Sequence, residues 1–238
     1  MVSLGIACAI SIAQAAGGDA PTVLERFLAR HDPPPTQYRA LRHLDARSEH
    51  FGASAWMDAW TEVDPAGGFR FQVIAEGGSG YIRSHVLSAA LAGEQKMWAS
   101  GDSARAALTR DNYEFIDREP SSPGATGTES PTALRVAARR NDILLIHGSI
   151  FVDSADADLL RVEGRLSKTP SFWTRRVEVV RRYQRINGVR VPISIESVAQ
   201  VLIAGRSTFR MTYEYETING EHVGTPQARI KSTNSPIH

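Results

Sequence analysis

The chain has 238 residues, of which 42% are hydrophobic and 22% charged, and its formal net charge is +1. This composition is that of an ordinary globular protein. The nearly balanced charge provides no strong positive field, which argues against nucleic acid as a partner. A chain of this length can bury a sizeable core as one all-β domain or as two smaller domains.

The first residues have the features of an export signal. Residues 4–12 form an almost uninterrupted apolar run, too short to span a bilayer, and a small-x-small triplet ending at Ala15 follows it. We therefore expect residues 1–16 to be a signal peptide cleaved near Ala15 or Ala16, and the mature protein to be periplasmic. A lipid anchor at Cys8, the only cysteine, is a minor alternative, because the residue three places earlier is a glycine.

A short amphipathic helix is expected after the signal. Thr22 and Glu25 have the spacing of a capping box, in which each side chain accepts a hydrogen bond from the other residue's backbone N–H. One helical stripe of apolar residues follows: Val23, Leu24, Phe27 and Leu28. The helix should end before the prolines at 33–35, and its stripe needs an apolar surface to cover.

Three strands in succession are expected next, over residues 38–51, 54–63 and 69–76. The third alternates clearly between apolar and polar residues, and a turn rich in Pro and Gly separates it from the second. Such a series is typical of an antiparallel meander.

The apolar period then changes from that of a strand to that of a helix, over residues 81–98. The stripe of this inserted helix consists of Ile82, Val86, Leu87, Ala90, Leu91 and Met97. A shorter helical turn over 103–108 and strands over 112–116, 134–138 and 143–152 follow, with a surface loop over 120–131.

The clearest strands lie between Leu159 and Thr217, where four consecutive strands with tight turns are expected. In the last of them Phe209, Met211 and Tyr213 share one face, and charged or polar residues occupy the other. Long antiparallel strands with one dry and one wet face pack a single side against a core. This region therefore defines the architecture.

The elements sum to about ten strands and two main helices in a mainly β (α+β) fold. A long antiparallel sheet twists and curls, so we expect an incomplete β-barrel covered by a lid of two amphipathic helices. We expect a single domain over residues 19–222 and a loose C-terminal tail over 223–238. The space between lid and sheet is either packed solid or open to a ligand.

Three features of the C-terminal third also carry a family resemblance. They are residues 163–165 followed by the Pro-Ser-Phe-Trp of 170–173, the Asn-Gly break at 187–188 with Val-Pro at 191–192, and the closing strand 205–215 with Ile-Asn-Gly at 218–220. In these features the chain resembles the outer-membrane lipoprotein-sorting family of LolA/LolB-like carriers. The N-terminal half matches only in the order of its elements, so the family's lid-locking arginine is assigned to no residue.

The resemblance implies a half-barrel carrier that shields acyl chains of a lipoprotein or another lipid, with an inner-membrane releasing complex as a further partner. Such a carrier needs no catalytic group, no cofactor and no metal. The expected lipid-binding residues are Phe209, Met211, Tyr213, Val191, Ile193, Val177 and Val179 of the sheet, and Ile82, Val86 and Leu91 of the lid. The alternative for each of them is a place in a closed core.

Other functions are less well supported by the sequence. The glycine-rich segment 77–81 lacks the last glycine of a nucleophile elbow, and the seven histidines have no metal-site spacing. The runner-up function is an envelope sensor of the same fold that binds a partner protein, although such regulators normally carry a second domain.

Overall fold

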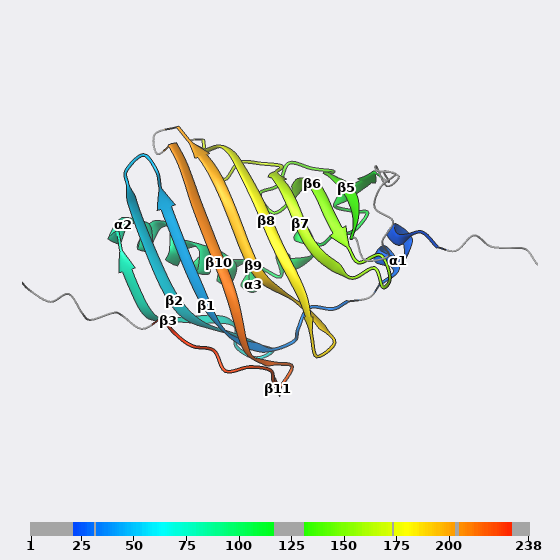
Figure 1. Cartoon of the computed structure of the whole chain (residues 1–238), viewed down its shortest axis with the longest axis horizontal. Helices are drawn as coiled ribbons and strands as arrows, with labels where there is room; N and C mark the ends of the chain where they lie inside the picture. Colours follow the sequence, from blue (N-terminus) through cyan, green and yellow to red (C-terminus); the bar gives the residue numbers. More distant parts are fainter. Residues whose placement is uncertain (1–20, 31, 117–130, 173, 203–204, 230–238) are drawn as a thin grey trace, which may run out of the picture.

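The computed structural model describes residues 21–30, 32–116, 131–172, 174–202 and 205–229 (Figure 1). The expected signal peptide, most of the expected loop 120–131 and the last nine residues lie outside this described part.

A single antiparallel sheet forms the body of the protein (Figure 1). Its strands are β1 (Tyr38–Ser48), β2 (Ala53–Asp64), β3 (Gly68–Gly78), β4 (Tyr113–Ile116), β5 (Thr132–Ala138), β6 (Ile146–Val152), β7 (Leu159–Leu166), β8 (Thr174–Ile186), β9 (Val189–Val201), β10 (Gly205–Ile218) and β11 (Glu221–His222). The order is β3-β2-β1-β10-β9-β8-β7-β6-β5-β4, and β11 pairs with β10. With β3 and β4 at opposite ends the sheet is open, which confirms the predicted incomplete barrel.

The first helix, α1 (Val23–Ala29), begins as its sequence predicts. The Thr22 hydroxyl accepts a hydrogen bond from Glu25 N at 3.2 Å, and the Glu25 carboxylate accepts one from Thr22 N at 2.8 Å. Two N–H groups that have no partner inside the helix are thereby satisfied. Leu24 and Phe27 are its buried residues.

The inserted helix is continuous but changes type along its length. It consists of α2 (Gly80–Ile82), the π-helical turn η1 (Arg83–Ser88) and α3 (Ala89–Ser100), and we call residues 80–100 the lid segment. A short 3-10 turn, η2 (Asp102–Ala106), follows it. In Figure 1 the lid segment runs behind the sheet, from the edge at β3 toward β9.

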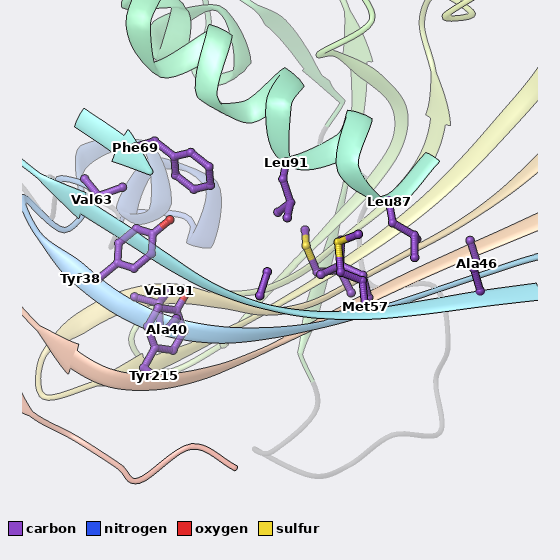
Figure 2. Packing of buried hydrophobic residues seen from close by; sticks show 14 of the residues in the cluster. Tyr38, Ala40, Ala46, Met57, Val63, Phe69, Leu87, Leu91, Val191 and Tyr215 are labelled. Atoms are coloured by element: carbon purple, nitrogen blue, oxygen red, sulfur yellow. The ribbon is translucent and has the colours of Figure 1, made fainter. Parts of the chain in front are cut away.

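The π turn changes which side chains of the lid segment face the sheet. A π turn hydrogen-bonds residues five apart, whereas an α-helix bonds residues four apart. Leu87 therefore follows Ile82 on the buried side, and Leu91 follows one α turn later. Figure 2 shows Leu87 and Leu91 pointing from the lid segment toward the sheet. Val86, expected on the same stripe, is 37% exposed.

Two apolar clusters lie on the same face of the sheet, which we call the inward face. The lid cluster joins the lid segment to β1, β2, β3, β9 and β10, and Figure 2 shows part of it. The α1 cluster joins α1 to β4, β5, β6 and β7. Each helix thus covers one end of the sheet. Val177, the one buried residue of β8, belongs to neither cluster, while Tyr183 and Ile186 near the end of that strand pack against the cluster edges.

Gly164, in the segment 163–165 that resembles LolA/LolB-like carriers, has a packing role. Gly164 of β7 lies directly opposite Gly148 of β6. A Cβ atom added at Gly148 would lie 2.0 Å from the Glu163 carbonyl oxygen, and one added at Gly164 would lie 2.4 Å from that of His147. The two backbones therefore approach each other more closely than any side chain allows.

The chain beyond β11 runs back along the outer face of the sheet. Arg229 donates to the fully buried carboxylate of Asp58 at 2.7 Å and to Asp45 at 2.8 Å, and its guanidinium lies 5.0 Å from the Trp56 ring centroid. Burial would raise the pKa of Asp58, but hydrogen bonds from His43 and Arg229 outweigh it and lower that pKa. Residues 223–229 of the expected loose tail are thus held to the sheet.

Candidate functional site

Two cavities lie side by side between the inward face and the lid segment, and Ala90 of the lid segment borders both. The apolar chamber has a volume of about 890 Å³ and lies beside the first half of the lid segment. The polar chamber has a volume of about 900 Å³ and lies beside the second half. Neighbouring inward positions of β9 and β10 line one chamber or the other, so the two form one trough along the strands.

The apolar chamber is lined without a single charged side chain among the described residues. Its wall is made of apolar and small hydroxyl residues: Val177, Ala199, Val201, Phe209, Ile82, Val86, Ser197 and Thr208 are among them. Phe51 and Tyr81, which are 61% and 70% exposed, also line it and mark its opening to solvent. A cavity of this size and chemistry suits a long apolar ligand.

The polar chamber combines apolar and charged groups. Ile195, Met211 and Tyr213 contribute its sheet side, and Met97 and Glu94 contribute its lid side. Three arginines also line it: Arg105, Arg181 and Arg190. This chamber can therefore hold an apolar group and a charged group together.

A buried ion pair joins the lid segment to the sheet. Arg42 of β1, with a side chain only 1% exposed, meets the Glu94 carboxylate of α3 with nitrogen–oxygen distances of 2.5 and 2.9 Å. It also donates to the Tyr38 hydroxyl at 2.7 Å, and its guanidinium lies 4.6 Å from the Tyr213 ring centroid. This two-pronged contact, the lid ion pair, is of the strong bidentate type.

The protonation states around the lid ion pair are well defined. Burial would lower the pKa of Arg42, but Tyr213 and Glu94 outweigh it and raise that pKa well above its usual value. Burial raises the pKa of Tyr213 to about 12, and it also raises the pKa of Tyr38. At neutral pH the arginine is therefore charged and both tyrosines are neutral hydroxyls.

The structure places six of the ten expected lipid-binding residues on the chamber walls. Phe209, Val177, Ile82 and Val86 line the apolar chamber, and Met211 and Tyr213 line the polar chamber. Val179 lies on the inward face of β8, between Val177 and Arg181, and is half-buried.

The other three expected residues lie elsewhere. Leu91 and Val191 are fully buried in the lid cluster, so they are core residues. Ile193 is the extra residue of a β-bulge, because Arg182 pairs with Ser194 while Tyr183 already pairs with Pro192. A bulge interrupts the alternation of faces, and among the described residues Ile193 belongs to neither apolar cluster and neither chamber.

Two arginines of the site were missed from the sequence, although a signal was present. Arg42 stands in phase with the inward-facing Ala40 and Leu44, and Arg181 stands in phase with Val177 and Val179. A charged residue in phase with an apolar face is an exception that indicates a special role.

In the described part of the chain, no group of three His, Cys, Asp or Glu side chains is placed to hold a metal ion. Likewise, none of the described helices has the length and hydropathy needed to cross a bilayer.

Comparison with known proteins gives remote structural likenesses only. No family model and no curated protein matches the sequence. A DUF1329 family protein from Desulfovibrio piger is 11% identical, with a TM-score of 0.35, over 76% of this chain and 84% of its own. A LolA superfamily protein from Nitrosomonas europaea is also 11% identical, with a TM-score of 0.37, over 82% and 92%. Lipovitellin is 12% identical, with a TM-score of 0.33, over 83% of this chain and 27% of its own.

Proposed function

We propose that this protein is a non-enzymatic carrier that holds the acyl chain of a lipid or a lipoprotein in the apolar chamber. The observation that carries the proposal is the chamber itself, about 890 Å³ in volume and without a charged side chain among its described lining residues. It lies beneath a helix that the lid ion pair and buried apolar side chains attach to the sheet.

The energetics of such binding follow from the wall. Each methylene transferred from water contributes about 0.8 kcal/mol, so burying about ten of them contributes about 8 kcal/mol before the costs of association. Apolar walls suffice for this, since no directional group is needed along an alkyl chain. Ser197 and Ser207, at inward positions of β9 and β10, lie on the same wall, and their hydroxyls can hydrogen-bond water.

The lid segment supplies a means of loading and release. Its contacts with the sheet include the side chains of Ile82, Leu87 and Leu91 and the lid ion pair. Arg83 also pairs with Glu76 of β3, and Gln95 donates to the Phe69 carbonyl oxygen. Outward movement of the lid segment would break the contact between Arg42 and Glu94 and join both chambers to solvent. Loading would therefore depend on the strength of this pair.

We also propose that the carrier sorts outer-membrane lipoproteins and acts in the periplasm. The features of residues 159–220 that resemble LolA/LolB-like carriers support this role, with a lipoprotein as cargo and an inner-membrane complex as its source. The apolar run of residues 4–12 supports export to the periplasm.

A pair of neighbouring substitutions tests the carrier function. Ala199 and Gln200 are adjacent in β9, but Ala199 lines the apolar chamber and Gln200 is exposed on the outer face. Ala199→Asp should abolish uptake of a fluorescent fatty acid, because it places a charge on the apolar wall. Gln200→Asp should leave uptake unchanged.

Native mass spectrometry of protein isolated from its own host, followed by organic extraction, gives an independent test. Recovery of phospholipid or an acylated peptide supports the proposal. An empty protein that takes up no fatty acid would overturn it and favour the partner-binding sensor.

A further inference from the structure

One row of directly paired residues crosses the inward face from β5 to β2. In order, it consists of Leu134, Ile150, Val162, Arg181, Ile195, Met211, Leu44 and Met57. Directly paired residues point to the same side of a sheet, so all of them face the lid side. Arg181 is the one charged residue in this otherwise apolar row.

Arg181 differs from the other arginines of the polar chamber in its partners. Arg190 pairs with Asp32 at 3.1 Å, and Arg105 pairs with Asp142 at 2.8 Å. For Arg181, no carboxylate lies within ion-pair distance in the described part of the chain.

The groups around Arg181 do not neutralise its charge. They are the side chains of Tyr183, Tyr213 and Glu94. The Glu94 carboxylate is already held by both terminal nitrogens of Arg42. Two arginines therefore share one carboxylate, which leaves one positive charge facing the chamber.

Arg181 lies where the charged head group of an amphiphile would lie if its tail occupied the apolar chamber. Arg181 is four residues from Val177 along β8, and a strand rises about 3.3 Å per residue, so the two lie about 13 Å apart. Val177 lines the apolar chamber and Arg181 the polar chamber. A tail in the apolar chamber would therefore end near the guanidinium, whose planar fork suits carboxylate and phosphate oxygens equally.

We propose that Arg181 binds the anionic head group, a carboxylate or a phosphate diester, of an acyl ligand whose tail lies in the apolar chamber. The ligand class is thus anionic single-chain or double-chain lipid, and neutral lipid is disfavoured. This inference rests on the proposed carrier function, because it requires that the apolar chamber holds the tail.

The first experiment measures binding of palmitic acid and of methyl palmitate by displacement of a fluorescent fatty acid from the full chain. Hydrogen bonds to charged groups favour the acid, and we expect it to bind at least about tenfold more tightly than the ester. Arg181→Gln should remove this preference by weakening the acid alone, and Arg181→Lys should retain part of it. Arg182→Gln, on the opposite face of the same strand, should leave both affinities unchanged.

A second pair of ligands separates the two head groups. Lysophosphatidylglycerol is a phosphate diester with a net charge, whereas lysophosphatidylcholine carries a compensating cation. A preference for the anionic member that disappears in Arg181→Gln assigns the site to phosphate. A preference seen only with palmitic acid assigns it to carboxylate.

The outcomes distinguish the two proposals. If wild type and Arg181→Gln bind acid and ester equally, the head-group site is refuted while the carrier function stands. If no acyl ligand binds to wild type, the carrier function fails and the head-group site fails with it. Thermal unfolding of each variant shows that a loss of binding is not a loss of fold.

Discussion

Removal of Glu94 should loosen the lid segment measurably. The Arg42 side chain is 1% exposed and that of Glu94 is 23% exposed, so Glu94→Ala would leave a buried guanidinium without its carboxylate. Breaking a fully buried pair on one side costs about 3–5 kcal/mol. Because water can reach part of the vacated site, we expect the free energy of unfolding to fall by about 2–3 kcal/mol. Alanine is a good helix former, so the loss would not come from helix propensity.

Urea unfolding measures this loss, and hydrogen exchange of the amides in residues 80–100 locates it. We expect the exchange to accelerate in the lid segment while β5 and β6 keep their protection. Lys96→Ala is the matched control, since Lys96 is exposed on the same helix and should change neither quantity. Unchanged stability and unchanged lid protection in Glu94→Ala would refute the reasoning that this pair holds the lid.

Three further outcomes are expected. Leu87→Ala should lower the free energy of unfolding by about 2–4 kcal/mol, because Leu87 is fully buried, whereas Val86→Ala should cost much less in the same urea titration. Equal losses of stability in the two variants would contradict the placement of Leu87, rather than Val86, on the buried side of the π turn. Asp58 has its pKa lowered below its ordinary 3.8, so it stabilises the fold above that pH, and this contribution disappears as the pH falls through the lowered pKa. Asp58→Asn should therefore be less stable than wild type at pH 7, and the difference should shrink as the pH falls below about 3.8 when both are unfolded with urea. A difference that stays constant with pH would exclude a contribution from the ionised Asp58. Gly164→Ala should destabilise the protein by pushing β6 and β7 apart, seen as faster amide exchange in these strands, and normal exchange there would refute the steric argument.

The strands were predictable because their signal is local. Alternation with a period of two identifies β8, β9 and β10 from the sequence alone, and Phe209, Met211 and Tyr213 indeed face the chambers. Ile193 was misplaced because a bulge depends on how β9 pairs with β8, which no local pattern records.

The missing parts of the site depend on contacts distant in the chain. Arg42 and Glu94 are 52 residues apart, and neither is unusual until the lid segment lies over β1. Ile82, Leu87 and Leu91 of the predicted lid stripe are buried, but Val86 is not, because the π turn places Leu87 on the buried side where an α period would place Val86. Cavities have no sequence pattern either, because the same apolar residues can meet a core or a ligand.

The π turn also makes the length of the lid segment adjustable. Residues 83–88 span the helix with one residue more than an α-helix would use. Deleting exposed Ser84 would bring Ile82 and Leu87 to a spacing of four, the α-helical repeat, with both side chains still facing the sheet. Loss of one codon at this point is therefore compatible with a working lid, and homologous chains should differ in length here before they differ elsewhere in the helix.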